Sequence, residues 1–392
     1  MKKILKPALS ATWMEINLTQ LEQNYLSVAR HVGDGVGIIS ILKSNAYGHG
    51  IKSVAKCLSS LGTEKIGLAS VGEVSELRCL GIKTPLLLLY PSRQSDFTEL
   101  IQNNAEITID NLDDALFLNS LAARFKKNIK IHVQIDTGLN RYGVNSTKAI
   151  NLIKKISVLR NLSIEGLWTH YTNSESNTRL SKQQFFIFMN IVRSISEMGI
   201  QVPFIHTANS GAICNLPVSY NKEVVAQYMP NAKILVRPGC LLYGTYSERK
   251  NPLNTKPILD SLQTSVMAIS TVEKGESVGY FQKFTASKKM SVATLPVGWG
   301  NTGYNPSPIV LSLHNKYIKG VGLISSNNMS VDVTNNPDVQ INSNIFLLKD
   351  GDKKINVDRV AKRHGMFVNQ FISMIGSKVE HVYFENKTKL NV

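Results

Sequence analysis

The stretch from Ile41 to Gly50 contains the residue best suited to covalent chemistry. An apolar run over residues 36–42, interrupted only by Gly37 and Ser40, has the length of a buried strand and is followed at once by Lys43. A buried ammonium is costly unless it is paired or used chemically. A desolvated lysine that loses its proton readily is what a Schiff base to an aldehyde cofactor requires. The same position also suits a lysine that only marks where the strand reaches solvent.

Polar residues follow the later predicted strands in a similar way. They are Asp136, Arg141, His170, Asn209, Ser210, Arg237 and Gly239. Each has an ordinary structural explanation by itself, since a histidine can be structural, an arginine can pair with a carboxylate and an Asn-Ser-Gly run can form a turn or a helix cap. Together with Lys43 they would bring an amine, a flat ring, hydroxyl and amide groups and a guanidinium to one place. That set suits a phosphorylated aromatic aldehyde, whose phosphate could lie at a helix N-terminus near Ser210 and Gly239.

The strands that carry these residues alternate with amphipathic segments of helical length. We expect the strands at residues 36–42, 65–69, 85–89, 106–109, 129–135, 164–168, 203–206 and 234–236. Such a series is typical of a (β/α)8 TIM-type barrel, which collects functional groups at the carboxyl ends of its strands. The alternative, a doubly wound sheet, would normally carry a glycine-rich loop after its first strand, and residues 43–48 do not form one. We therefore predict an α/β barrel over residues 1–250.

The pattern changes after residue 250, where Pro252 and Pro257 mark a junction. We predict a mainly β C-terminal domain over residues 251–392. Its expected strands are at residues 262–272, 290–296, 309–313, 319–324, 329–333, 345–348 and 379–384, and its expected helices are at residues 356–364 and 367–375. A first short strand at residues 12–16 precedes the barrel and is free to join this domain.

The composition argues against several classes of function. The chain has 392 residues and a formal charge of +16, but its basic residues are scattered and accompany no nucleic-acid-binding motif. Its four cysteines have neither metal-ligand nor disulfide spacing, so we expect no metal and a reducing compartment. No apolar run reaches membrane-spanning length. We expect a soluble, cytoplasmic protein that binds neither nucleic acid nor membrane.

Several stretches together resemble the alanine racemase family, whose members use pyridoxal 5'-phosphate. The likeness begins at Lys43-Ser44-Asn45-Ala46-Tyr47-Gly48-His49-Gly50, which is similar to the cofactor-binding signature of the family. Further stretches match in order along nearly the whole chain, at residues 135–141, 165–171, 206–210, 236–239, 242–244, 275–280 and 331–334. The family fold is a barrel followed by a β domain, assembled as a head-to-tail homodimer, which agrees with the pattern of strands and helices.

The resemblance implies two catalytic bases. Lys43 would form the Schiff base with the cofactor and transfer protons on one face of it, and Tyr280 of the other subunit would act on the opposite face. This arrangement makes chemical sense, because racemisation removes a proton from one face of the substrate and returns it to the other. The implied reaction is the interconversion of L-alanine and D-alanine, a step of D-alanine biosynthesis.

The resemblance also implies a set of binding residues. Arg237 would face the pyridine nitrogen of the cofactor, where a permanent positive charge disfavours ring protonation and suppresses side reactions. His170 would pack on the ring. The other cofactor-binding positions are Asn209 and the four that would hold the phosphate, Tyr47, Ser210, Gly239 and Cys240. The positions expected near the substrate are Arg141, Ser326 and Asn327.

The chain departs from the family pattern mainly around the active-site entrance. Gln134 stands where many members have a lysine that becomes carbamylated, and Trp299 replaces an entrance tyrosine. Ser326 and Asn327 replace a methionine and an aspartate, and Asn369 aligns with a tyrosine that contacts the phosphate. These changes remove fixed charge and keep hydrogen-bonding groups, so they bear on substrate range more than on the cofactor.

Two alternative functions therefore remain open. The altered entrance suits a racemase with a broader or a non-alanine specificity. A protein that binds pyridoxal phosphate with little turnover would explain the barrel residues. Proteins of that second type resemble the barrel alone, so the C-terminal domain and its Tyr280 motif count against it.

Overall fold

The computed structural model describes residues 11–246, 251–304, 310–313 and 316–385. The chain divides into two compact units. The barrel unit comprises Leu21–Ser44 and Ile51–Lys256. The β unit comprises Met1–Gln20, Asn45–Gly50 and Pro257–Val392, so the short segment that follows Lys43 and Ser44 belongs with the C-terminal part of the chain.

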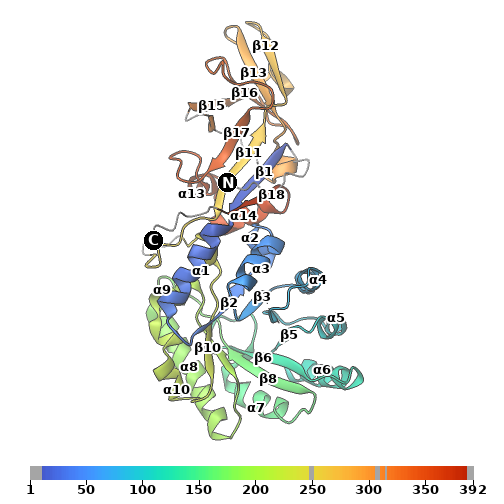
Figure 1. The fold of residues 1–392 in the computed structure, drawn as a ribbon, viewed down its shortest axis with the longest axis vertical. Helices are drawn as coiled ribbons and strands as arrows, with labels where there is room; N and C mark the ends of the chain where they lie inside the picture. The colour runs from blue at the N-terminus through green and yellow to red at the C-terminus, as the bar shows by residue number, and fades with distance from the viewer. Residues whose placement is uncertain (1–10, 247–250, 305–309, 314–315, 386–392) are drawn as a thin grey trace. The chain divides into compact units, whose positions relative to one another are not determined.

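Eight parallel strands form a closed barrel in the barrel unit (Figure 1). They are β2 (Gly37–Ile41), β3 (Lys65–Leu68), β4 (Leu86–Leu88), β5 (Glu106–Ile109), β6 (Ile129–Asp136), β8 (Leu162–Trp168), β9 (Phe204–His206) and β10 (Lys233–Val236). Their order is β5-β4-β3-β2-β10-β9-β8-β6, and a parallel pairing of β5 with β6 closes the ring. A further short strand, β7 (Val144–Asn145), also pairs with β6. The predicted barrel is confirmed, and every predicted strand end lies within two residues of the observed one.

Helices connect these strands and cover the outside of the barrel (Figure 1). They are α3 (Ile51–Ser60), α4 (Val71–Cys79), α5 (Phe97–Gln102), α6 (Leu112–Arg124), α7 (Ser146–Ile156), α8 (Thr178–Glu197), α9 (Ser210–Asn215), α10 (Lys222–Ala226) and α11 (Cys240–Tyr243), with 3-10 turns η1 (Gln94–Asp96) and η2 (Pro217–Tyr220). The first helix, α1 (Leu18–Val32), precedes β2. Five helices of the barrel unit begin at an asparagine whose side-chain oxygen accepts a backbone N–H of the first turn, namely at Asn111, Asn145, Asn177, Asn209 and Asn221. These caps fix where each preceding loop ends.

The interior of the barrel is not purely apolar. Strands β2 to β5 bury every residue, as expected for barrel strands that are covered by helices on one side and by one another on the other. Four ionisable residues nevertheless lie inside strands, Lys65 on β3, Glu106 on β5, His132 on β6 and His206 on β9, and each is less than 5% exposed. Buried charges of this kind persist only where they are paired.

The β unit contains a nine-stranded sheet in the order β12-β13-β16-β15-β14-β17-β11-β1-β18. Its strands are β1 (Thr12–Asn17), β11 (Leu259–Ser265), β12 (Ala268–Val272), β13 (Met290–Leu295), β14 (Val310–Leu313), β15 (Lys316–Val321), β16 (Met329–Asp332), β17 (Asn344–Lys349) and β18 (Glu380–Phe384). Its helices are α12 (Trp299–Thr302), α13 (Val357–Arg363) and α14 (Val368–Gly376), with the 3-10 turn η3 (Tyr280–Gln282). The prediction of a mainly β C-terminal domain is confirmed. Strand β1 pairs with both β11 and β18.

The structure corrects two predicted strands of the β unit. The run at residues 262–272 is two strands, because β11 pairs with β1 and β17 whereas β12 pairs with β13, and the chain changes partner between them. Strand β15 begins at Lys316 and not at residue 319, since the pairing with β14 extends to Lys316. Ile309, the first residue of another predicted strand, lies outside the described residues.

The segment α2 (Lys43–Tyr47) forms a left-handed turn directly after β2. Ser44, Asn45, Ala46 and Tyr47 all have positive φ angles, between 52° and 57°. For residues with a side chain this conformation costs roughly 1–2 kcal/mol each, so four in succession need strong support from their surroundings. Residues 44–47 contain no glycine that would indicate such a turn.

Contacts inside the β unit provide that support. The amides of Gly48 and Gly50 both donate to the carbonyl of Asn45, at 3.0 Å. Nε2 of His381, on β18, lies 2.8 Å from the carbonyl oxygen of Gly48. The hydroxyl of Tyr383 donates to the carbonyl of His49. Strand β18 therefore supplies two of the polar contacts that hold the turn.

Helix α14 also packs against this turn without room for a side chain. A methyl group added at Gly376 would lie 1.8 Å from the carbonyl oxygen of Gly48. We therefore expect Gly376→Ala to destabilise the full chain by about 1–3 kcal/mol, measured as a lower midpoint of urea unfolding. The matched control is Gly72→Ala on α4, where no atom lies within 4 Å of the added methyl group. Because alanine favours a helix, Gly72→Ala should be neutral or stabilising. Equal midpoints for the two variants would contradict this packing.

Candidate active site

Lys43 lies at the carboxyl end of β2, where its ammonium is half-buried. Its Nζ donates a hydrogen bond of 2.8 Å to the hydroxyl of Tyr90, which follows β4. The same Nζ lies 5.4 Å from the centroid of the Tyr90 ring. The residue that follows β4, two strands away from β2 in the barrel, therefore helps to orient the amine.

Tyr90 is a site residue that the sequence did not reveal. Its ring lies 6.0 Å from Cζ of Arg141 and 5.5 Å from the ring of Tyr142. Tyr90 thus connects Lys43 to Arg141, one of the positions expected near the substrate. The available signal was a polar aromatic residue directly after the apolar run that forms β4.

Arg237 follows β10 and is only 4% exposed. Its Nη2 donates to the carbonyls of Thr169 and Thr207, at 2.7 and 3.1 Å, and its Nη1 donates to the carbonyl of His206 and, at 2.9 Å, to Nδ1 of that residue. Its Cζ lies 4.9 Å from the ring centroid of Trp168. Burial lowers the pKa of Arg237 to about 9, which leaves the guanidinium charged at neutral pH.

His170 follows β8 and is surrounded by positive charge. Its Nδ1 lies 3.5 Å from Nη2 of Arg237. Burial lowers the pKa of His170 to about 3, with further lowering by the charges of Arg237, Arg141 and Lys43. The imidazole is therefore neutral at physiological pH, and three cations lie close enough to act on it.

The loops after β9 and β10 meet at Ser210. The Oγ of Ser210 accepts hydrogen bonds from the amides of Gly239, at 3.0 Å, and Leu241, at 3.5 Å. Ser210 is also the first residue of α9, and Cys240 is the half-buried first residue of α11. A hydroxyl and two amides are thus gathered where two helices begin, as a phosphate requires.

Two of the predicted strand-end residues have structural roles here. The side chain of Asn209 caps α9 by accepting the amide of Ala212 and also accepts the hydroxyl of Ser174. The carboxylate of Asp136 accepts backbone N–H groups from the loop that follows it, at 2.8 to 3.0 Å. These bonds shape the loops that carry Ser210 and Arg141.

Gln134 is 2% exposed on β6 and pairs in register with Trp168 on β8. Neither Oε1 of Gln134 nor Nε1 of Trp168 has a hydrogen-bond partner among the described residues. Both groups are buried, so the position offers an unused acceptor and an unused donor close to the barrel's carboxyl end.

The remaining predicted site residues belong to the β unit. Tyr280 is 64% exposed and begins the turn η3. Trp299 is 55% exposed, in the turn Gly298-Trp299-Gly300, where the amide of Gly300 donates to the carbonyl of Ser326 at 2.7 Å. Trp299, Ser326 and Asn327 are therefore neighbours. Tyr47 lies in the left-handed turn, and Asn369 lies on α14.

The barrel residues fit a phosphorylated aromatic aldehyde. An amine at the end of β2 can react with the aldehyde, and a neutral imidazole beside a buried guanidinium offers a flat surface and a charge for the ring. Lys43, Arg141 and Arg237 supply positive charge for anionic groups, and Ser210 with the amide of Gly239 suits a phosphate. Among the described residues no cluster of His, Cys, Asp and Glu could hold a metal ion, and no helix is both long and apolar enough to cross a membrane.

Lowering the pH should destabilise the folded chain partly through His170. In the unfolded chain this histidine binds a proton near pH 6.5, whereas its pKa in the folded chain is about 3. Between these values the unfolded state holds the extra proton, so stability falls as the pH falls, by about 1.4 kcal/mol per pH unit for one full proton. Urea unfolding from about pH 7.5 to about pH 5 should show a shallower loss for His170→Gln than for the wild type. Parallel pH profiles would contradict the assignment.

Comparison with known proteins places this geometry in a family. Residues 16–247 match the alanine racemase N-terminal domain and residues 260–383 match the alanine racemase C-terminal domain. The alanine racemase of Halothermothrix orenii is 30% identical, over 97% of this chain and 98% of that protein. Alanine racemase 1 of Clostridium acetobutylicum is 31% identical, over 95% of each.

A solved structure of similar fold supports the same grouping. The alanine racemase of Clostridium difficile 630 superposes with a TM-score of 0.86 at 26% sequence identity, and the match covers 96% of each chain. The two domain models, the relatives of matching length and the similar solved structure all indicate the same family. The chain belongs to the alanine racemase family.

Proposed function

We propose that this chain interconverts L-alanine and D-alanine with pyridoxal 5'-phosphate as its cofactor. The observation that carries the proposal is the convergence of Lys43, His170, Ser210 and Arg237 at the carboxyl ends of strands of one barrel, with three cations and no carboxylate among the charges that act on His170. Such a site favours an anionic aromatic cofactor and an amino acid with a carboxylate. The full-length likeness to alanine racemases supports alanine as the substrate.

Individual residues of the chain have separate roles in the proposed reaction. The bound cofactor supplies an electron sink that makes the Cα–H of an attached amino acid acidic. Lys43 moves a proton at its Nζ on one face, and Tyr280 of a second subunit moves a proton at its hydroxyl on the opposite face. Arg237 would lie at the pyridine nitrogen, where its charge would keep the ring unprotonated. His170 packs on the ring.

Other residues bind the cofactor and orient the substrate. We assign the phosphate to Ser210, Gly239 and Cys240, which Asn209 supports by capping α9, and the resemblance to the family adds Tyr47 as a phosphate-binding position. Arg141 attracts the substrate carboxylate, and its contact with the Tyr90 ring aligns it with the amine of Lys43. We assign Ser326 and Asn327, which lie beside Trp299, to substrate binding.

We further propose a homodimer with shared active sites. Tyr280 and Phe281 are 64% and 84% exposed in the single chain, which suits residues that reach another copy. The four cysteines form no disulfide, in keeping with the reducing cytoplasm, where we place the enzyme.

A broader amino-acid specificity is the second candidate function. Gln134 leaves an acceptor unused beneath the site, and Ser326 is smaller and more polar than the methionine it replaces. Both changes favour substrates with a larger or more polar side chain than alanine. Racemisation rates across a panel of amino acids distinguish the two candidates, because an alanine-specific enzyme should discriminate strongly against serine.

The proposal predicts that Lys43→Ala abolishes both colour and turnover. The purified wild-type chain should show the visible absorbance of a cofactor bound through Lys43, and the variant should lack this band and racemise no alanine. The matched control is Lys52→Ala, which removes an exposed lysine paired with Glu76 and should leave both properties unchanged. A wild-type protein that stays colourless after incubation with pyridoxal phosphate would contradict the proposal.

A further inference from the structure

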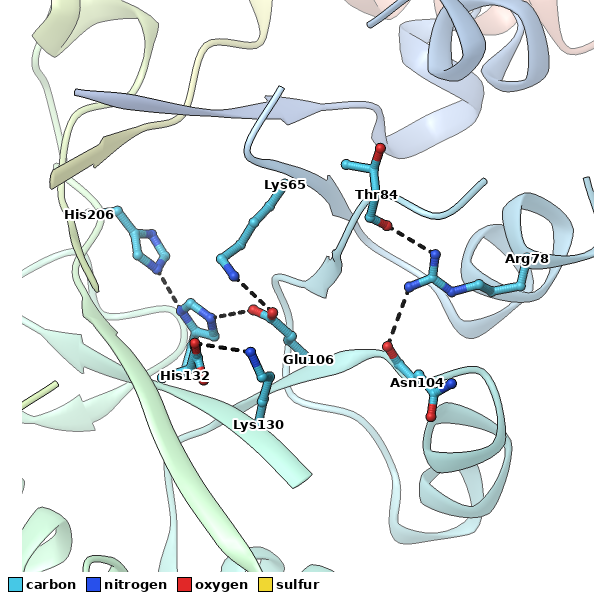
Figure 2. Close-up of polar contacts among 9 residues, drawn as sticks. Lys65, Arg78, Thr84, Asn104, Glu106, Lys130, His132 and His206 are labelled. Atoms are coloured by element: carbon cyan, nitrogen blue, oxygen red, sulfur yellow. Dashed lines mark hydrogen bonds and ion pairs between the residues drawn. The ribbon is translucent and has the colours of Figure 1, made fainter. Parts of the chain in front are cut away.

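A continuous row of buried polar side chains runs through the barrel interior to Arg237. Nζ of Lys65 lies 2.8 Å from Oε1 of Glu106, whose Oε2 lies 2.8 Å from Nε2 of His132. Nδ1 of His132 lies 2.9 Å from Nε2 of His206. Figure 2 draws this contact and the contacts of Glu106 as dashed lines. Nδ1 of His206 lies 2.9 Å from Nη1 of Arg237. All five side chains belong to residues less than 5% exposed, and we call them the interior row.

The two ends of the interior row determine where its hydrogens lie. A guanidinium has only N–H donors, so Nδ1 of His206 must accept the hydrogen bond from Arg237. An ionised carboxylate has only acceptors, so Nε2 of His132 must carry the hydrogen that it shares with Glu106. Neither assignment depends on the other, because the two bonds lie at opposite ends of the row.

Only one donor and acceptor assignment of the hydrogen bond between His132 and His206 is compatible with the bonds to Glu106 and to Arg237. A neutral His132 with hydrogen on Nε2 has a bare Nδ1, which can only accept. A neutral His206 with a bare Nδ1 carries its hydrogen on Nε2, which donates to His132. A second proton on either ring would place two N–H groups face to face. Both rings must therefore be neutral, with the hydrogen on Nε2.

The surroundings agree with this arrangement. Burial lowers the pKa of His132 and of His206, which keeps both rings neutral. Burial alone would raise the pKa of Glu106, but its hydrogen bond with His132 and the charge of Lys65 outweigh that effect and lower it to about 2. A methyl group at Gly166 would lie 2.4 Å from Nδ1 of His132, so a glycine there leaves room for the ring.

We propose that Glu106, with Lys65 as its counter-ion, is a positioning residue that fixes the tautomers of His132 and His206 so that a bare Nδ1 holds Arg237 in place. The proposal rests on the proposed function, in which Arg237 faces the cofactor. Glu106 acts through three successive hydrogen bonds and lies within a strand, remote from the residues that would contact substrate.

Glu106→Gln tests whether Glu106 determines which atom donates and which accepts in each hydrogen bond of the interior row. The ammonium of Lys65 needs an acceptor, so it takes the only amide oxygen and leaves the amide NH2 facing His132. His132 must then accept at Nε2 and move its hydrogen to Nδ1. That change forces His206 to carry its hydrogen on Nδ1, where it faces an N–H of Arg237. One substitution should therefore reverse two tautomers and disturb the guanidinium.

Two further variants separate this effect from a loss of packing. In Lys65→Met with Glu106→Gln, no ammonium competes for the amide oxygen, so the oxygen can face His132 and the original tautomers should return. Glu165→Gln is the matched control, because it makes the same change at a buried carboxylate that pairs with Lys130, outside the interior row (Figure 2 shows Lys130). It should leave both tautomers as in the wild type.

The readout is 15N NMR of the ring nitrogens in the full-length protein labelled on histidine, with and without added pyridoxal phosphate. For the wild type we expect hydrogen on Nε2 and a bare Nδ1 in both His132 and His206. Hydrogen on Nδ1 of either ring in the wild type would overturn the proposal even if no variant folds. Glu106→Gln should shift both rings together, and a change in one ring alone, or in neither, would also overturn it.

Catalysis gives a second readout. Glu106→Gln should lower kcat for alanine by roughly tenfold, as expected when a charged group loses one well-placed hydrogen bond, and the double variant should regain part of it. Glu165→Gln should change kcat by less than about twofold. The tautomers are observable without cofactor or turnover. A wrong prediction of the tautomers is therefore distinguishable from a failure of the proposed racemase activity.

Discussion

The barrel is organised around a permanent positive charge buried at its carboxyl end. The guanidinium of Arg237 is only 4% exposed and depends on backbone carbonyls that follow β8 and β9 and on one imidazole nitrogen. These acceptors converge because Trp168 pairs in register with His206 and Asn209 forms a bridge with Arg237. A shift in the order or register of the strands would leave a buried charge without partners, which is strongly destabilising.

The same charge shapes the chemistry around it. It helps to keep His170 neutral, and it requires a bare nitrogen on His206, which in turn requires the tautomer that Glu106 maintains through His132. The amine of Lys43 is oriented separately, by its hydrogen bond to the hydroxyl of Tyr90. The left-handed turn after Lys43 contacts the C-terminal strand β18 and a glycine of α14, so the C-terminal part of the chain helps to set its conformation.

The sequence predicted the barrel well because its strands are short, apolar and separated by regular helices. It also predicted which strand ends carry Lys43, His170, Ser210 and Arg237, since a residue at a strand end follows directly from the strand's limits. The left-handed turn could not be predicted, because it depends on contacts with residues more than 300 positions later and has no glycine within Ser44–Tyr47. Lys65, Glu106 and His132 lie within strands, where an alternating pattern does not tell which polar side chains will meet inside a barrel. Residues 262–272 were predicted as one strand because their apolar pattern continues across the point where the pairing partner changes. The structure has two strands there, β11 and β12.

The proposed reaction requires two separate bases, Lys43 and Tyr280, on opposite faces of the substrate. Its most direct test is the incorporation of solvent deuterium at Cα of L-alanine and of D-alanine by Tyr280→Phe, with Tyr317→Phe as the control for loss of an exposed tyrosine hydroxyl in the same unit. We predict that Tyr280→Phe keeps the bound cofactor, exchanges the Cα hydrogen of only one enantiomer and no longer interconverts the two, while the control behaves as the wild type. Exchange of both enantiomers and racemisation at the wild-type rate in Tyr280→Phe would contradict the account.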